Sequence, residues 1–423
     1  MSRALLGLAF GAFAIGTTEL GVVGMLPEIT RELGVAPSSA GLLVSAYAIG
    51  VVVGAPTLTT WGIRHSPRRT LTALLGLLVL GNVLASLAPG FLLLAAARAC
   101  TGLAHGAFFG VGSVVARASV PPHRGTRAVA VLFAGIASAS ILGVPAGAFL
   151  AQQWSWRVVF VLCAVLGLLA AAGLTAWLPD SSGEPVRLRA EATAFRRPQV
   201  WLLLAVTMIG LAATYSVYAN ITLVLTDLGH VPTRWLTAVL VLFGLGTTVG
   251  TLLGGRLGDR FGMAVVATGL PALVVVLVLT ASSARGPTSM VLSVVAIGAL
   301  AFAMNPVMQA QVIGAARVAG GSLVSAANQG AFNVANATGP AVATAALATG
   351  HGPSAVLWVA AGFAAAGTVL AGTAWWVDRR SPWSSAISTT PLAGTDAWMG
   401  AAAAGAHRGD HPASAHGGGR TTS

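Results

Sequence analysis

Lysine is absent from this sequence of 423 residues, and charged side chains of all kinds make up only 8% of it. Soluble globular proteins carry about 25% charged residues. With 56% hydrophobic residues, the chain has too few charges to keep its surface in water, which excludes a soluble protein and predicts a surface covered by lipid. The formal net charge of +12 could suit nucleic acid, but the arginines lie in short gaps between apolar runs, so no nucleic-acid partner is expected.

Motifs of soluble enzymes are missing as well. The two cysteines, Cys100 and Cys163, both lie inside apolar runs, which is typical of buried small side chains rather than of a disulfide or a metal site. The sequence has no GxxxxGKS-type phosphate loop, no HExxH and no paired CxxC. We therefore expect no enzyme, no cofactor, no metal site and no ATP-driven transport by this chain.

Long apolar runs dominate the sequence, and a run of about 20 apolar residues is needed to cross a bilayer as a helix. A strand reading is excluded because barrel strands alternate polar and apolar residues, which these runs do not. We predict an all-α membrane protein with twelve transmembrane helices in two pseudo-symmetric bundles of six. The runs are Ala4–Met25, Ala40–Trp61, Thr70–Leu87, Phe91–Ala116, Ala128–Ala151, Val158–Leu178, Gln199–Leu223, Leu236–Leu257, Met263–Leu279, Met290–Val312, Leu323–Ala346 and Ser354–Val377.

Arginine placement predicts the orientation. Loops on the cytoplasmic side of a membrane protein carry an excess of basic residues. With the N-terminus inside, one set of segments holds about four times as many arginines as the other, where only Arg31, Arg157, Arg234 and Arg285 occur. We predict a multi-pass protein of the inner (plasma) membrane with both termini cytoplasmic. The inside arginines are Arg3, Arg64, Arg68, Arg69, Arg117, Arg124, Arg127, Arg187, Arg189, Arg196, Arg197, Arg256, Arg260, Arg317, Arg379 and Arg380.

The predicted domain organisation follows from one long charged loop. We predict an N-terminal six-helix bundle over 1–178, a cytoplasmic linker over 179–198, a C-terminal bundle over 199–377 and a disordered cytoplasmic tail over 378–423. A weak repeat relates the halves: Arg64 and Asp259 follow corresponding helices 195 residues apart, and Gly143 and Gly339 lie 196 apart. Repeated six-helix halves are typical of transporters with a substrate site between them.

Glu19 is the acidic residue that lies well inside a predicted span. A charged carboxylate at membrane depth is costly, so this group is expected to be protonated part of the time and could carry a proton across the membrane. The alternative is a structural carboxylate paired with an arginine or capped by Thr17 or Thr18.

Arg98 is the matching cation in the fourth predicted helix. It begins a stripe with Gly102, Gly106 and Gly110 at four-residue spacing, which allows another backbone to approach closely. Two interpretations remain open: Arg98 tunes or relays the proton of Glu19, or it is a structural cation bonded to carbonyls of the first helix. His105, on the same helix, could titrate, although a packing role is the expectation.

Other residues predict a bent helix and a polar cavity. Gly135, Gly143, Pro145 and Gly147 predict a kinked, closely packed fifth helix that could act as a seam between halves. Amides and aromatic residues inside spans either tie helices together or line a cavity. The candidates for the substrate cavity are Phe108, Tyr215, Tyr218, Asn220, Asn333 and Asn336.

Several of these patterns resemble the major facilitator superfamily. Leu94, Arg98, Gly102 and Gly106 resemble its fourth-helix motif, and the glycines and proline of the fifth helix resemble the motif of its drug:proton antiporters. The segments Thr18-Glu19-Leu20 and Gly24-Met25-Leu26-Pro27 are similar to the chloramphenicol-efflux and sugar-efflux branch. The superfamily's loop motif is matched in the second half by Gly255, Leu257, Asp259, Arg260 and Gly262.

The resemblance implies a monomeric twelve-helix protein that rocks around a central cavity. It would exchange protons for small, neutral aromatic drugs such as chloramphenicol, and the alternative is export of a sugar or other metabolite by the same fold. One departure matters: Arg64 stands where the first-half loop motif has an aspartate. A charge lock held there in the family is absent or is made by different partners.

Overall fold

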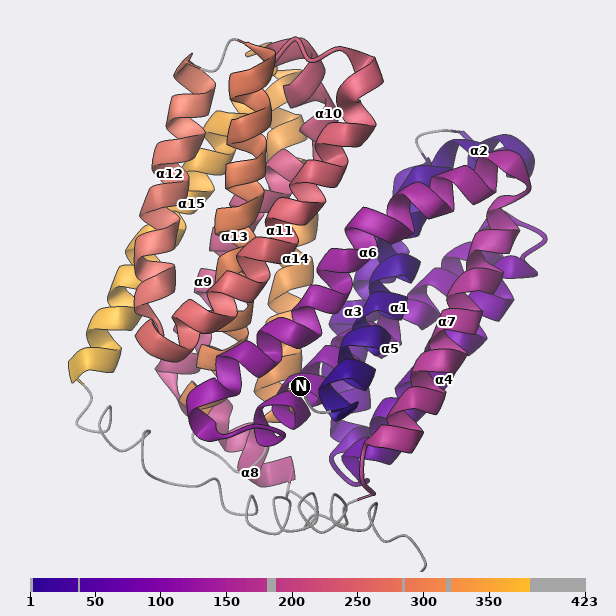
Figure 1. Ribbon diagram of the computed structural model, residues 1–423, viewed down its shortest axis with the longest axis vertical. Helices are drawn as coiled ribbons and strands as arrows, with labels where there is room; N and C mark the ends of the chain where they lie inside the picture. Colours follow the sequence, from indigo (N-terminus) through magenta and orange to yellow (C-terminus); the bar gives the residue numbers. More distant parts are fainter. Residues whose placement is uncertain (1–2, 37–38, 181–187, 284–285, 317–320, 381–423) are drawn as a thin grey trace, which may run out of the picture.

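The computed structural model describes residues 3–36, 39–180, 188–283, 286–316 and 321–380, and these residues form helices and their connections (Figure 1). The predicted all-α fold is confirmed. The predicted tail beyond residue 380 lies outside the described residues, as do Arg187, Arg285 and Arg317.

The first half contains six long helices. They are α1 (Arg3–Gly21), α3 (Ala40–Gly62), α4 (Pro67–Ser86), α5 (Phe91–Ala118), α6 (Gly125–Gln153) and α7 (Trp156–Trp177). Helix α1 ends earlier than its apolar run and continues as a 3₁₀ turn, Val22–Met25, into the short helix α2 (Leu26–Leu33).

The second half repeats this arrangement. Its long helices are α9 (Pro198–Ala219), α11 (Leu236–Phe261), α12 (Ala264–Ser283), α13 (Pro287–Ala316), α14 (Ser322–Ala348) and α15 (Ala355–Arg380). A short helix α10 (Ile221–Leu223) and a π turn over Val224–Leu228 follow α9. The segment predicted as a linker contains the short helix α8 (Leu188–Thr193) and a 3₁₀ turn over Ala194–Arg196.

Among the described residues, eleven of the twelve long helices are long and apolar enough to cross a bilayer, and α14 is the exception. Asn328, Gln329, Asn333 and Asn336 lower the hydropathy of α14. Three of these amides are buried within the protein, and α14 packs against α3, α5 and α9 as well as α15. Its polar face is therefore turned away from lipid.

Glycines bring the central helices of each half into backbone contact. A Cβ on Gly54 of α3 would overlap the backbone of Leu103 in α5, and a Cβ on Gly250 of α11 would overlap the backbone of Ala299 in α13. The second pair is equivalent to the first, because Gly250 lies 196 residues after Gly54 and Ala299 lies 196 residues after Leu103. Small residues at these positions let the helices approach closely where lipid provides no hydrophobic drive for association.

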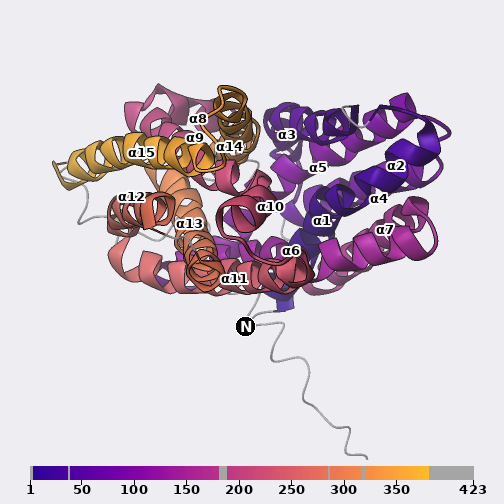
Figure 2. The ribbon, with the colours of Figure 1, turned by 90° about the horizontal axis from the view of Figure 1, so that it is seen from above.

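The two sets of helices meet at one end of the molecule and diverge toward the other. In Figure 1 the lower parts of α6 and α11 lie side by side, whereas α2 and α10 lie apart at the top. Figure 2 shows the two halves side by side from above. The closed end carries the α3–α4 loop with Arg64, Arg68 and Arg69, so the charge distribution assigns this end to the cytoplasm.

Candidate functional site

A pocket lies between the two halves and encloses about 830 Å³ of empty space, part of it open to solvent. Its wall combines aromatic rings with a few polar groups, the composition typical of a small-molecule site. The aromatic residues are Phe109, Phe133, Tyr215, Tyr218, Phe243, Phe302 and Phe332. The polar residues are Glu19, His105, Ser140, Thr214, Thr247, Asn305, Gln329, Asn333 and Asn336.

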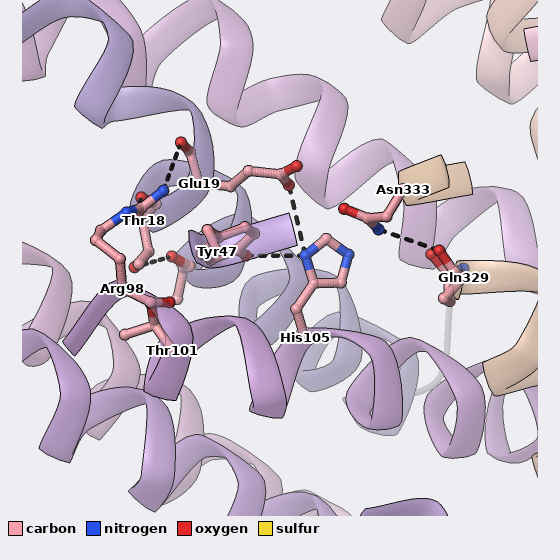
Figure 3. Close-up of polar contacts among 9 residues, drawn as sticks. Thr18, Glu19, Tyr47, Arg98, Thr101, His105, Gln329 and Asn333 are labelled. Carbon is pink, nitrogen blue, oxygen red and sulfur yellow. Dashed lines mark hydrogen bonds and ion pairs between the residues drawn. The ribbon is translucent and has the colours of Figure 1, made fainter. Parts of the chain in front are cut away.

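Glu19 extends from the last turn of α1 into this pocket (Figure 3). One carboxylate oxygen, Oε2, lies 3.5 Å from Nδ1 of His105, and the Glu19 side chain is 15% exposed. Thr17 and Thr18 do not cap the carboxylate, because their hydroxyls donate to the carbonyls of Phe13 and Ala14. The carboxylate therefore faces the pocket rather than a structural partner of its own helix.

His105 presents a single ring nitrogen to two partners. The hydroxyl of Tyr47 lies 2.8 Å from Nδ1, the same atom that faces Glu19 (Figure 3). A neutral imidazole has one donor and one acceptor nitrogen, whereas the protonated ring donates from both. Gain or loss of a proton at Nδ1 would therefore exchange its hydrogen bond between Tyr47 and Glu19. The sequence favoured a packing role for this histidine; the structure buries it against Tyr47 and Phe109, and it also lines the pocket.

Arg98 is buried, with 1% of its surface exposed, and binds the backbone of α1. Its Nη1 donates to the carbonyl of Thr18 at 2.6 Å and its Nη2 to that of Glu19 at 3.4 Å. The last carbonyls of a helix have no partner within the helix, and a cation is favoured there. The guanidinium also lies 4.4 Å from the ring centre of Tyr47. These contacts are those of the structural interpretation, since the Glu19 carboxylate points away from Arg98 (Figure 3).

The glycines of α6 hold α1 in place. A Cβ on Gly135 would overlap the backbone of Ala9, and one on Gly143 would contact the Thr17 side chain at 2.9 Å. Gly147 faces Gly21, and α6 continues as a helix through Pro145. The close contact between α6 and α1 positions Glu19 where the two halves face each other.

The glycine stripe of α5 has a comparable role toward α3. Gly102 packs against the backbone of Tyr47, and Gly106 packs against Val51 and Ala55. These contacts place Tyr47 between Arg98 and His105.

Four predicted cavity residues line the pocket and two do not. Tyr215, Tyr218, Asn333 and Asn336 are part of its wall. Phe108 is a correction: it is fully buried with its ring against Gly11, because it faces α1 rather than the pocket.

Asn220 is also a correction. It follows the end of α9, where its amide donates to the carbonyl of Ser216 at 3.0 Å. The sequence did not single out Phe133, Phe243, Phe302 and Phe332, because an aromatic residue within an apolar run gives no sign of which way it faces.

An amide network lies at the wall of the pocket and continues into the buried contact between the halves. The Gln309 amide of α13 donates to Ser325 Oγ at 2.5 Å and to Ser113 Oγ of α5, in the other half, at 3.3 Å. Its carbonyl oxygen accepts from Asn328 at 2.7 Å and from Gln329 at 3.3 Å. Buried amides in such a network are costly to separate unless water replaces their partners.

The arginine-rich end is closed by Asp259 of α11. Its Oδ1 accepts from the backbone N–H groups of Thr126 at 2.8 Å and Arg127 at 3.3 Å, at the start of α6. Its Oδ2 lies 3.5 Å from Nε of Arg127. Gly255 packs on Ala130 and Arg127 of α6. The second-half loop motif therefore holds the two halves together at this end.

The remaining motif residues lie beside this contact. Arg260 is exposed, with its guanidinium 5.0 Å from the ring centre of Phe261, and Gly262 ends α11 with a φ of +54°. Arg117 of α5 donates to the carbonyl of Ala310 in the second half at 2.9 Å. Within the part of the chain that the structure describes, no three His, Cys, Asp or Glu side chains gather as a metal site would require.

Comparisons with known proteins agree with this architecture. Residues 8–329 match the Major Facilitator Superfamily. The chain is 40% identical over 351 residues to the inner membrane transport protein YdhP of Escherichia coli (strain K12), covering 83% of this chain and 90% of that protein. It is 34% identical over 364 residues to a chloramphenicol resistance protein of Streptomyces lividans, covering 83% and 91%.

A solved structure shares the fold at low sequence identity. The crystal structure of the human organic anion transporter MFSD10 (TETRAN) superposes with a TM-score of 0.71 at 14% identity, covering 87% of this chain and 99% of that one. Given the family match, the relatives and the membrane-spanning helices, this chain belongs to the Major Facilitator Superfamily and is a multi-pass inner-membrane transporter, not an enzyme.

Proposed function

We propose that this transporter exports small, mainly apolar aromatic molecules in exchange for protons, with Glu19 as the proton-carrying group. The observation that carries the proposal is the position of the Glu19 carboxylate, which faces the pocket between the halves 3.5 Å from His105. It is the one acid among the described residues of the pocket wall. Intramembrane acids of transporters commonly mark proton pathways.

Coupling would follow from competition in one pocket. A bound apolar molecule removes water from Glu19, which disfavours the charged carboxylate and favours its protonated form. Arg98 is held on the carbonyls of α1, and within the described ranges it forms no direct ion pair with the carboxylate. One proton crossing a potential of about 150 mV releases roughly 3.5 kcal/mol, enough for a substrate gradient of a few hundred-fold.

The conformational change would be a rocking of one half against the other. The halves are joined at the arginine-rich end by Asp259 and by the contact of Gln309 with Ser113. Opening that end requires these contacts to break while the upper ends approach each other. Glu19 lies between the two ends, so its proton would be exposed to one side at a time.

The chemistry of the wall supports a substrate class. Asn305 and Asn333 are 4% and 5% exposed, and their Oδ1 atoms have no hydrogen-bond partner within the described part of the chain. A buried acceptor without a partner is costly, so both amides favour a ligand that donates from hydroxyl or amide groups. Seven aromatic rings surround them. Chloramphenicol, a neutral aromatic molecule with hydroxyl and amide donors, fits both features, and one relative is named for resistance to it.

Export of a sugar or another polar metabolite is the second candidate. The buried amides of α13 and α14 favour it, because sugars are recognised through several hydrogen bonds. The seven aromatic rings of the wall favour the aromatic substrate instead. Transport by purified protein of a labelled sugar at rates above those for aromatic drugs would establish this alternative.

The test is the substitution Glu19→Gln in proteoliposomes with a pH-sensitive dye inside. Wild-type protein is expected to move protons when an aromatic drug is added, and Glu19→Gln to move none. The matched control is Asp227→Asn, which neutralises an exposed carboxylate and should behave as wild type. Size-exclusion chromatography establishes that each variant is folded. A Glu19→Gln protein that exports at the full rate and still moves protons would end the proposal.

A further inference from the structure

Two helices at the arginine-rich end begin at positions related by the internal repeat. The first amide groups of α6 include those of Thr126 and Arg127, and the first of α14 include those of Ser322 and Leu323. Ser322 lies 196 residues after Thr126, and Leu323 lies 196 residues after Arg127. The same offset relates Gly143 to Gly339. The first N–H groups of a helix have no partner within the helix and need an acceptor from elsewhere. The same problem therefore arises twice in this transporter.

At α6 the acceptor comes from the opposite half. Asp259 Oδ1 receives the N–H groups of Thr126 and Arg127 at 2.8 and 3.3 Å. By the repeat, the matching acceptor for α14 would come from the α3–α4 connection, where Arg64 occupies the position of Asp259. Arg64 is exposed and can only donate. No acidic residue occurs between Gly62 and Arg69, so this connection offers no carboxylate to α14.

Glu191 of the linker helix α8 occupies this place instead. Its Oε1 accepts from the N–H of Ser322 at 3.2 Å and its Oε2 from the N–H of Leu323 at 2.6 Å. The residue is 1% exposed. Unlike Asp259, it forms no ion pair with any basic side chain in the described ranges. Among the described residues, the hydrogen bonds of its buried carboxylate all go to the start of α14.

We propose that Glu191 is a positioning residue for the closed arginine-rich end, where it caps α14 in place of the acid that the α3–α4 connection lacks. Helix α14 packs against α3 and α5 there, with Ala326 in contact with Gly110. Glu191 of the linker thus holds the start of α14 in position for that contact. Asp259, in contrast, caps a helix of the opposite half. The proposal concerns the closure of this end and depends on neither the substrate nor the proton.

The test measures access to both ends of the transporter. Cys100 and Cys163 are replaced by Ala, and single cysteines are introduced as Ser113→Cys at the buried contact between the halves or as Ser140→Cys in the pocket wall. A membrane-impermeant maleimide is applied from the cytoplasmic side in inside-out vesicles for position 113. It is applied from the opposite side in intact cells for position 140.

Glu191→Ala leaves two N–H groups without an acceptor when the end is closed, whereas water can reach them when it is open. We expect labelling at position 113 to rise roughly 2- to 30-fold, the range for loss of a helix cap, and labelling at position 140 to fall. Glu191→Gln retains one acceptor oxygen for these N–H groups and should stay closer to the wild type than Glu191→Ala at both positions. Asp180→Asn, which neutralises a surface carboxylate at the same end, should change neither rate.

The two positions separate a gating role from loss of structure. Unfolding would raise labelling at both positions, whereas a shift of the conformational equilibrium raises one and lowers the other. Glu191→Ala with unchanged labelling at both positions would overturn the proposal, and so would a parallel rise at both. Neither reading uses drug export, so a failure of the proposed function would leave the result intact.

Discussion

Replacing Arg98 tests whether this buried cation supports α1 or takes part in proton transfer. Arg98→Met removes a donor at 2.6 Å from the Thr18 carbonyl, a weaker one at 3.4 Å from the Glu19 carbonyl, and the contact of the guanidinium with the Tyr47 ring. A hydrogen bond involving a charged group contributes about 1.5–3 kcal/mol, and stacking of a cation on a ring adds about 0.5–2 kcal/mol. Removing a buried cation also relieves its desolvation cost, which offsets part of this loss.

We expect a net destabilisation of about 2–4 kcal/mol for Arg98→Met. At about 2.1 cal/mol/K of unfolding entropy per residue, a chain of this length should show a fall in melting temperature of about 2–5 °C. The Lys variant keeps a charged donor that can serve only one carbonyl well, so it should fall about halfway between the wild type and Arg98→Met. Arg256→Met, at an exposed arginine, is the matched control and should stay within about 0.5 kcal/mol of wild type.

The assay is the loss of monodisperse protein on heating in detergent, combined with drug-driven proton movement in proteoliposomes. If Arg98 acts through the carbonyls of α1, Arg98→Lys retains proton coupling with an unchanged pH profile. A melting temperature of Arg98→Met equal to that of wild type would refute the structural argument. A shifted pH profile in a stable Arg98→Lys protein would instead favour a direct role in the proton site.

Further predictions concern the gate, the packing between helices and the linker. Asp259→Asn keeps one acceptor for the start of α6 but loses the negative charge, which should cost about 1 kcal/mol. Cytoplasmic labelling of Ser113→Cys should therefore rise about fivefold. Unchanged labelling would contradict the role of Asp259 as a cap of α6. Gly339→Ala would place a Cβ on the backbone of Ala212 and should lower the stability to thermal unfolding by about 1–3 kcal/mol. Gly362→Ala, which has open space around it, should be neutral or stabilising by up to about 1 kcal/mol. Equal melting temperatures for the two variants would contradict the close contact of Gly339 with Ala212. Burial raises the pKa of Glu191 at the closed end, and exposure to water would return it to its ordinary range. A proton is then bound more tightly in the closed state, so acidifying the cytoplasmic side toward about pH 5 should lower labelling at position 113 in wild type relative to Glu191→Gln, and equal pH profiles would refute this.

Much of the fold could be predicted because each helix in lipid must satisfy the hydrogen bonds of its own backbone groups. Each membrane span therefore appears in the sequence as a continuous apolar run. Glu19 and Arg98 were visible for the same reason: a charge in such a run is costly and therefore conspicuous. The exception is α14, whose amides lower its hydropathy because they face other helices and the pocket.

The sequence alone could not assign partners. It left Arg98 open between two roles, and the close approach of α1, α5 and α6 directs its guanidinium to the carbonyls of Thr18 and Glu19. It favoured packing for His105, which is buried against Tyr47 and Phe109 but also borders the pocket. It placed Phe108 in the cavity, whereas the rotation of α5 turns Phe108 toward α1 and its neighbour Phe109 toward the pocket.

The amino-acid sequence by itself determined the number of long helices, their membrane environment and the twofold repeat, because hydropathy and glycine spacing are properties of consecutive residues. The tertiary structure alone decided which side chains meet between distant helices. The cap of α14 illustrates the difference: the sequence shows that residue 64 is not an acid, but only folding brings Glu191, more than a hundred residues before Ser322, to the vacant N–H groups. Contacts of this kind depend on helix rotation and crossing, which no local pattern records.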